Sequence, residues 1–113
     1  ADGKNIYGRT CFACHQSEGQ GIPGTFPPLA KSDFLNADSN RAINAVLHGL
    51  SGEVTVNGKK YNSVMTSQNL TDQEISDVLT YVYNSWGNNK TKVTPEMVKT
   101  QRAKPAPKAK DFH

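Results

Sequence analysis

Apolar side chains recur at helical spacing in two stretches of the chain, and a capping signal precedes each stretch. The first stretch predicts a helix from Asp38 or Ser39 to Gly49, and its apolar face consists of Ala42, Ile43, Val46 and Leu47. The second opens on the capping box Thr71-Asp72-Gln73-Glu74 and runs to Trp86, before Gly87, and its apolar face consists of Ile75, Val78, Leu79, Val82 and Tyr83. Each predicted helix therefore has one face to bury.

Weaker signals predict two further helices and a hairpin. A first helix is expected from Asp2 to about Cys14, and a short one from Thr94 to about Arg102, with Pro95 at its first helical position. Asn57-Gly58 favours a two-residue turn and predicts a small β-hairpin. The segment 16–34 is rich in Gly and Pro and predicts a long loop. The fold class is therefore all-α, with three to four helices and one hairpin.

Composition limits what can fill the core. The chain has 113 residues, of which 35% are hydrophobic and 8% aromatic, so it has room for one domain and little aliphatic material. We expect something besides aliphatic side chains to fill the interior. No run reaches the roughly 18 apolar residues of a membrane span. Because the chain begins at Ala1 without a charged and apolar leader, we expect a processed or excised form.

Charge divides the chain after Gly87. Residues 1–87 carry six Lys and Arg against eight Asp and Glu, whereas residues 88–113 carry seven against two. The basic residues concentrate in a Pro- and Lys-rich stretch rather than among aromatic residues, which disfavours nucleic-acid binding. We expect residues 1–87 to form the domain, and residues 88–113 to form a short helix and a flexible basic tail that tethers it.

The chain has two cysteines, in Cys11-Phe12-Ala13-Cys14, directly followed by His15. A disulfide oxidoreductase uses the same spacing, but it normally places the cysteines in a βαβ unit, which this pattern does not predict. A zinc site needs four ligands, and His48 and His113 are neither paired nor close in the sequence. The third alternative is haem c, in which both thiols bind one porphyrin and the adjacent imidazole ligates the iron. The pentapeptide favours this alternative.

Such a haem needs a second axial ligand and an acceptor for the histidine N–H group. Met65 is the candidate ligand, because it lies in an irregular polar stretch and a thioether opposite an imidazole suits electron transfer. His48 is the other candidate, although a hydrogen bond near the end of its helix is the favoured role. The carbonyl group of Pro27 or Pro28 is the candidate acceptor for His15.

The chain resembles the class I cytochromes c over residues 1 to about 87. The resemblance rests on these positions: Gly3, Tyr7, the pentapeptide 11–15, the Pro-Pro-Leu loop 27–29, Met65, Val78 and Tyr81. It implies one covalent haem surrounded by the helices, with iron bound by His15 and Met65. It also implies that the first helix crosses the last at Gly3, Tyr7, Val78 and Tyr81. Thr66 stands where the family commonly has proline, which would loosen the ligand loop.

A narrower resemblance is to the cytochrome domain tethered to copper nitrite reductases, and to cytochrome subunits of periplasmic dehydrogenases and oxidases. It rests on five further segments: 26–30, 46–52, 56–58, 70–75 and 84–88, followed by 93–98. It implies a periplasmic electron carrier that takes electrons from a soluble donor and passes them to a type 1 copper. The alternative is a free-standing cytochrome or a subunit that serves a dehydrogenase or terminal oxidase.

No catalytic residues are predicted, because the chain shows no nucleophile and base pair and both axial positions of the iron would be filled. A peroxidase-like enzyme would require Met65 to be absent from the iron. For docking we expect a mostly uncharged rim around the haem edge, formed by Phe12, Ile22, Pro23, Thr66 and Gln68.

Overall fold

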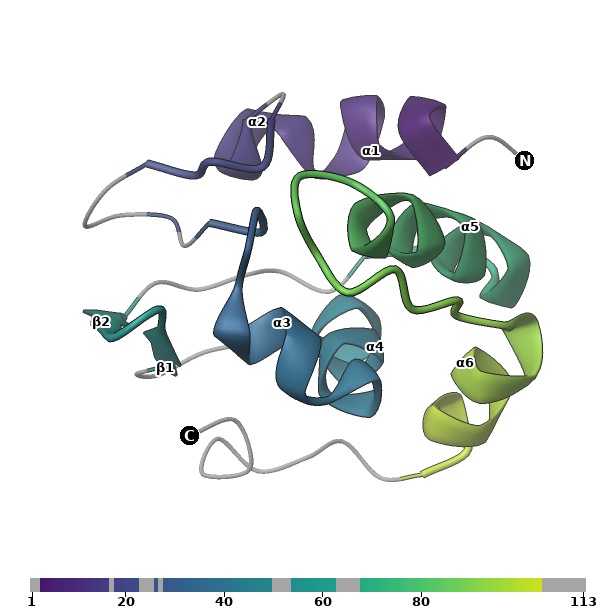
Figure 1. Ribbon diagram of the computed structural model, residues 1–113. Helices are drawn as coiled ribbons and strands as arrows, with labels where there is room; N and C mark the ends of the chain where they lie inside the picture. The colour runs from purple at the N-terminus through teal and green to yellow at the C-terminus, as the bar shows by residue number, and fades with distance from the viewer. Residues whose placement is uncertain are drawn as a thin grey trace.

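The computed structural model describes residues 3–16, 18–22, 26, 28–49, 54–62 and 68–104, with only the backbone of Ala13 and Cys14. The described part is mostly helical, with one two-stranded antiparallel sheet (Figure 1). Its elements in chain order are α1 (Gly3–Thr10), α2 (Phe12–His15), α3 (Asp33–Ala37), α4 (Ser39–His48), β1 (Val54–Val56), β2 (Lys59–Tyr61), α5 (Asp72–Tyr83) and α6 (Pro95–Arg102).

Three helices, α4, α5 and α6, begin where the capping residues in the sequence predict. The Asp38 carboxylate accepts hydrogen bonds from two backbone N–H groups at the start of α4. At α5, Thr71 and Glu74 form the predicted capping box. At α6, Thr94 is the N-cap and Pro95 is the first helical residue. Capping side chains satisfy N–H groups that would otherwise lack a partner, so these local signals confirm where the helices begin.

The predicted hairpin is also confirmed. Strands β1 and β2 pair with Val54 opposite Tyr61, and the turn residues Asn57 and Gly58 have φ angles of 53° and 80°. Asn57 also exchanges two hydrogen bonds with Asp33, at 2.7 and 2.9 Å. The tip of the hairpin is therefore bound to the start of α3.

Three boundaries differ from the expectations. The predicted loop 16–34 extends into α3, whose N-cap Ser32 accepts a hydrogen bond from the backbone N–H of Leu35. The first helix is divided at Cys11, where α1 ends and α2 begins. Helix α5 ends at Tyr83 rather than continuing to Trp86, which adopts a φ angle of 54°. These short elements depend on side-chain caps and tertiary packing that hydrophobic spacing does not reveal.

Helix α1 crosses α5 at a very short distance, as the resemblance implied. A Cβ atom built on Gly3 would lie 2.2 Å from the Asp77 carbonyl oxygen and 2.8 Å from Tyr81 Cβ. The rings of Tyr7 and Tyr81 lie 5.8 Å apart between centroids, and Val78 is buried. Only glycine allows the two backbones to approach this closely.

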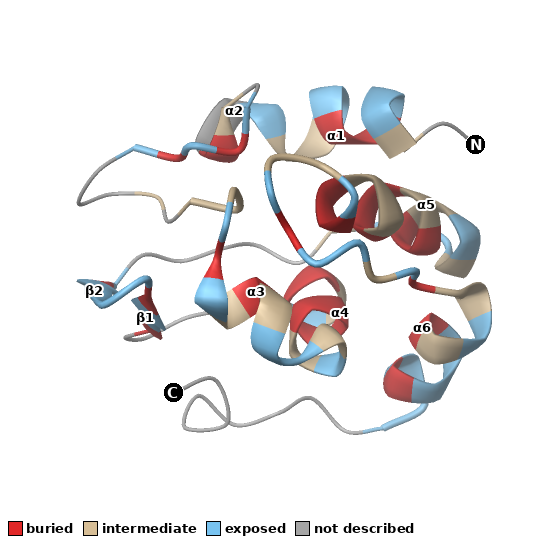
Figure 2. Cartoon of the chain, in the orientation of Figure 1, coloured by how far each residue is buried: buried red, intermediate tan, exposed pale blue. Residues whose placement is uncertain are grey.

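Helix α6, the short helix expected after residue 87, packs against α4 and α5. Val93 and Val98 are 1% and 0% exposed and belong to the main apolar cluster, with Met97 packed against it (Figure 2). The Val93 carbonyl accepts hydrogen bonds from Ser76 and Thr80 of α5. The change in charge at Gly87 therefore does not coincide with the end of the packed structure. No helix among the described residues is long and apolar enough to cross a bilayer.

Candidate haem site

The Cys11–His15 turn is held in helical geometry. The backbone N–H of Cys11 donates to the Tyr7 carbonyl, and that of His15 donates to the Cys11 carbonyl, both at 2.9 Å. Cys11 packs partly buried against the main apolar cluster, and His15 is 8% exposed. Because positions four apart lie on one side of a helical turn, His15 lies on the same side as Cys11. The turn thus places the Cys11 thiol and the His15 imidazole at one edge of the core.

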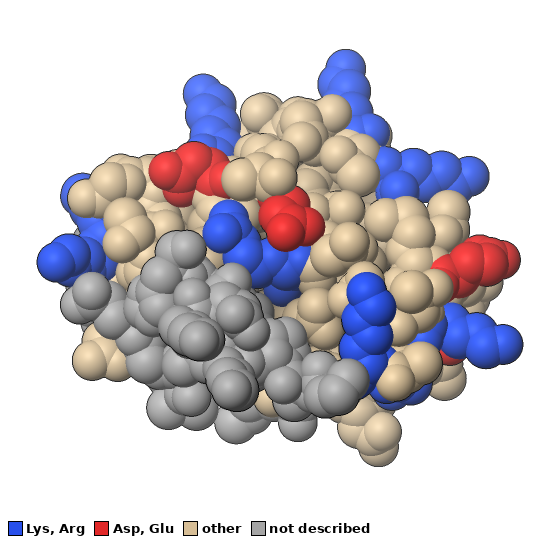
Figure 3. Space-filling view, turned by 90° about the horizontal axis from the view of Figure 1, so that it is seen from below, with Lys and Arg blue, Asp and Glu red and all other residues tan. Residues whose placement is uncertain are grey.

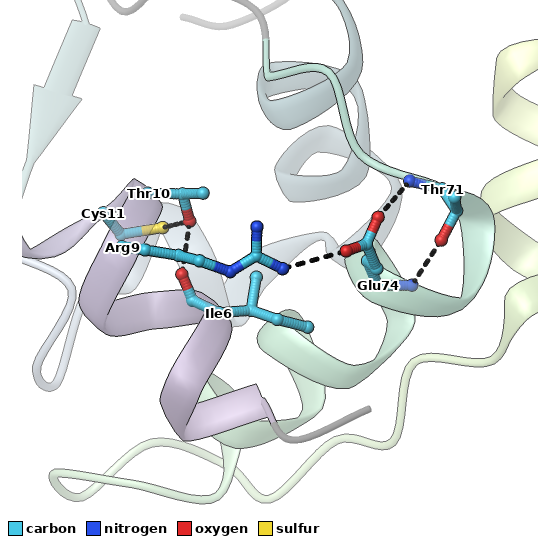
Figure 4. A network of polar contacts seen from close by, with 6 residues as sticks. All are labelled: Ile6, Arg9, Thr10, Cys11, Thr71 and Glu74. Atoms are coloured by element: carbon cyan, nitrogen blue, oxygen red, sulfur yellow. Dashed lines mark hydrogen bonds and ion pairs between the residues drawn. The ribbon is translucent and has the colours of Figure 1, made fainter.

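One group of polar contacts lies beside Cys11 at the end of α1, and another joins α1 to the start of α5 (Figure 4). The Thr10 hydroxyl donates to the Ile6 carbonyl at 2.7 Å and lies 3.3 Å from the Cys11 sulfur. Arg9 forms an ion pair of 2.9 Å with Glu74, the capping-box residue of α5. The hydrogen bond from the Thr71 backbone N–H, followed by that from Arg9, lowers the pKa of the Glu74 carboxyl.

Three aromatic rings fix the residue that follows His15. The hydroxyl of Tyr7 donates to the Gln16 carbonyl at 2.5 Å, and burial raises the pKa of this hydroxyl well above its ordinary value. The Tyr7 ring lies 5.8 Å from Tyr81 and 5.2 Å from Trp86, and the latter two rings lie 5.6 Å apart. The crossing of α1 and α5 therefore also determines where the histidine turn ends.

The Pro-Pro-Leu loop is anchored from two sides. The Gly19 carbonyl accepts from the N–H groups of Leu29 and Ala30 at 2.6 and 3.0 Å. From beyond α5, the Asn88 side chain donates to the Leu29 carbonyl at 3.0 Å and to the Val82 carbonyl at 2.9 Å. Asn88 is buried, and its role was missed because a single Asn after a helix carries no periodic signal. These bonds fix the backbone next to Pro28.

The other predicted site residues are placed as follows. Pro27 and Met65 lie outside the described residues, as do Pro23 and Thr66 of the expected docking rim. Acceptance of the His15 N–H by Pro27 or Pro28 and ligation by Met65 stay predictions. His48 is the last residue of α4 and is exposed. The predicted ligand segment is followed by Gln68, whose backbone N–H donates to the Val46 carbonyl of α4 at 2.9 Å.

Two apolar clusters of the described residues have the chemistry that a porphyrin needs. The main apolar cluster carries Cys11 and Leu29 at its edge, and a second cluster joins α4 to the hairpin through Ala45, Val54, Val56, Tyr61 and Phe34. Thiols can form thioethers, an imidazole can ligate iron, and apolar walls keep water from the metal. The described residues therefore fit a covalently bound haem.

Comparison with known proteins identifies the family. The family model described as cytochrome c matches residues 1–86. The chain belongs to the cytochrome c family. Its cofactor is accordingly haem c, bound covalently and containing iron, and its mostly helical structure with a small antiparallel sheet is the class I cytochrome c fold. The cytochrome is an electron-transfer module.

Its relatives include cytochromes of different size. The chain is 45% identical over 114 residues to a cytochrome c-552 of Thermus thermophilus, covering 92% of this chain and 86% of that protein. It is 30% identical over 90 residues to the cytochrome c subunit of a quinone alcohol dehydrogenase of Gluconacetobacter polyoxogenes, covering 76% of this chain and 19% of that subunit. It is 31% identical over 109 residues to a fructose dehydrogenase cytochrome subunit of Gluconobacter japonicus, covering 90% of this chain and 22% of that subunit. None of these three is named a copper nitrite reductase.

Proposed function

We propose that this cytochrome carries single electrons between a soluble donor and a partner redox enzyme in the periplasm. Cys11 and Cys14 hold the haem through thioethers, and His15 and Met65 ligate its iron. The haem supplies a one-electron couple between ferrous and ferric iron. The observation that carries this proposal is the Cys11–His15 turn, packed at the edge of the core of a chain that matches the cytochrome c family.

The chain's own residues set the properties of that couple. The carbonyl group of Pro27 or Pro28 accepts the second N–H of His15, which orients the imidazole. The Met65 thioether favours ferrous iron and raises the reduction potential. With both axial positions occupied, the protein is an electron carrier rather than an enzyme. The periplasm is proposed because thioether attachment requires reduced thiols and the haem-attachment machinery outside the cytoplasm.

Replacement of Met65 by Ala tests the ligand assignment. The ferric absorption band of the iron–sulfur bond should disappear, the potential should fall, and the sixth position should open to added ligands. His48→Ala is the matched control and should change none of these properties. An unchanged spectrum in Met65→Ala would show that another residue is the ligand. A wild-type protein without the sulfur band that readily reacts with peroxide would instead favour the peroxidase-like alternative.

Attachment through each cysteine can be tested separately. In intact-mass measurements, Cys11→Ala and Cys14→Ala should each retain haem through one thioether, whereas the wild type retains it through two. Haem that leaves the wild-type protein on denaturation in acid solvent would contradict covalent attachment by these residues.

Docking is proposed through an uncharged face beside the attachment turn. Phe12 and Ile22, the exposed large hydrophobic residues of the described chain, are 46% and 38% exposed, and Gln68 is partly exposed. On the face seen from below in Figure 3, which lies away from α1 and α2, Lys and Arg side chains are spread out, with a few Asp and Glu side chains among them, rather than gathered in one patch. Small transient redox interfaces bury below about 1,200 Å² and rely mainly on packing.

The partner proposed from the sequence resemblance is the type 1 copper of a copper nitrite reductase. The dehydrogenase relatives favour a second candidate, a dehydrogenase that donates electrons to this cytochrome. Stopped-flow reduction and oxidation with each purified partner distinguishes the two. With the correct partner, Phe12→Lys and Ile22→Lys should slow transfer more than Lys99→Glu on α6 does. Equal slowing by all three variants would show that docking uses another face.

A further inference from the structure

The segment that follows the predicted Met65 ligand is bound to α4. The backbone N–H of Gln68 donates to the Val46 carbonyl at 2.9 Å, and Leu70, 8% exposed, packs in the main apolar cluster. Thr71 then begins α5. Residues 68–72, here called the exit segment, are therefore bound to the packed fold.

Arg102, on α6, holds this exit segment from the other side. Its Nη2 atom donates to the Leu70 carbonyl at 2.9 Å, and its Nε atom donates to the Asp72 carboxylate at 2.8 Å. The guanidinium thus spans a backbone acceptor and a side-chain acceptor two residues apart. Charged donors form stronger hydrogen bonds than neutral ones, and the planar guanidinium group restricts where both acceptors can lie.

The backbone of Arg102 is itself fixed by buried contacts. The preceding residue, Gln101, is 6% exposed, and its side-chain oxygen accepts from the Asn44 side chain of α4 at 2.9 Å. One turn earlier, Val98 is 0% exposed. Because Asn44 and Val46 both belong to α4, the exit segment is bound by two helices that are bound to each other (Figure 1).

We propose that Arg102 is a positioning residue for the sixth haem ligand, resting on the proposed ligation of iron by Met65. Met65 stands three residues before Gln68 in the sequence, so the position of the exit segment limits how far Met65 can move. Arg102 restrains the exit segment, so it slows and disfavours replacement of the thioether. Helix α6 lies beyond the 1–86 match to the family model, so this restraint comes from outside the matched haem unit.

The test uses the purified ferric holoprotein and imidazole, which competes for the sixth position. Arg102→Met keeps much of the aliphatic stem and removes both hydrogen bonds, and it should bind imidazole about three- to tenfold more tightly. Amide hydrogen exchange at Gln68 and Leu70 should accelerate by a similar factor. Arg102→Lys, which keeps the charge but cannot span both acceptors, should fall between this variant and the wild type.

Two controls separate positioning from loss of charge and from loss of an ion pair. Lys99→Met removes the same charge from an exposed position of α6. Arg9→Met removes an ion pair of the same kind, 2.9 Å to Glu74, but leaves the bonds between Glu74 and Thr71 of the exit segment in place. Both controls should leave imidazole affinity within about twofold of the wild type, because exposed ion pairs contribute little and neither control removes the hydrogen bond to the Leu70 carbonyl.

Three outcomes would overturn the proposal. If Arg102→Met and the two controls changed imidazole affinity equally, the contacts of Arg102 with the exit segment would not be the cause. A lower denaturation midpoint in Arg102→Met with unchanged imidazole affinity and exchange would show a purely structural role. Met65→Ala measured in parallel identifies the third outcome: if it keeps the sulfur band, the ligand assignment fails, whereas failure of Arg102 alone leaves that assignment intact.

Discussion

Helices α1 and α6 both pack against α5, but they do so by different means. At α1 a glycine lets two backbones meet, with no room for a Cβ atom beside the Asp77 carbonyl. At α6 the contacts combine buried valines with side-chain hydrogen bonds to the Val93 carbonyl. The first contact depends on a shape that any larger residue destroys, whereas the second can be weakened one bond at a time.

The largest expected effect is removal of α6. A chain that stops at Asn88 should lose about 3 to 6 kcal/mol of unfolding free energy, because Val93 and Val98 each contribute roughly 1.5 to 3 kcal/mol by burial. A chain that stops at Lys104 is the control and should change by less than about 0.5 kcal/mol. Urea unfolding of the holoproteins provides the measurement. Similar stability of the two truncated chains would show that α6 does not support the fold.

The next effect tests the glycine contact. Gly3→Ala should destabilise the protein by about 2 to 4 kcal/mol, because the new methyl group would meet the Asp77 carbonyl at 2.2 Å. Gly8→Ala, in the same helix with no atom within 4 Å of a new Cβ, should stabilise by up to about 1 kcal/mol. Chemical denaturation measures both. Equal destabilisation by both variants would show that the loss of stability is not specific to the crossing with α5.

A smaller effect concerns Tyr83 on the buried face of α5. Its hydroxyl donates to the Leu35 carbonyl at 2.5 Å, and burial raises its pKa to about 12. Between the unfolded pKa of about 10 and the folded value, the unfolded state loses its proton first, so stability should fall as pH rises. Tyr83→Phe should show a shallower fall between pH 9 and pH 11, at a cost near neutral pH of about 1 kcal/mol. If the fall of stability with pH were as steep in Tyr83→Phe as in the wild type, Tyr83 would not be its cause.

The smallest effect concerns the exposed capping box of α5. The pKa of Glu74 is lowered first by the Thr71 backbone N–H and then by Arg9, so its stabilising contribution is present above the unfolded pKa and lost as pH falls through the folded value. When the pH is lowered below the ordinary pKa range of glutamate, the unfolding free energy of Glu74→Gln should therefore fall less than that of the wild type. Unfolding curves of wild type and variant at neutral and acidic pH would reveal this, and parallel pH profiles would contradict it.

Local chemistry made much of the fold predictable. Thr71 with Glu74, Asp38, and Asn57-Gly58 each act on neighbouring backbone groups, so their effect can be read from the sequence. Helix α3 was not predicted because its five residues are too few to show helical periodicity. Its N-cap, Ser32, stands at the end of a Gly- and Pro-rich loop. An anchoring role for Met97 and Val98 could be expected from their place in the short helix, whereas the burial of Val93 was not predicted because its polar and basic surroundings obscured its role in the core.

The site was predictable to the extent that it is contiguous. Cys11, Cys14 and His15 form one turn, so spacing alone indicated haem attachment. Asn88 and Arg102 act on carbonyl groups at Leu29 and Leu70, far away in the sequence. A side chain that binds a distant backbone carbonyl leaves no pattern near either partner, so only the three-dimensional structure reveals these supports.

The crossing of α1 and α5 also affects the order in which the protein matures. Residues 11–15 leave the ribosome, or a translocation channel entered N-terminus first, well before α5 exists to cover α1. Because contacts across such a long sequence separation form late and slowly, the nascent chain presents residues 11–15 before α5 packs against α1. The topology thus provides an interval during synthesis in which the cofactor can be joined to an accessible turn.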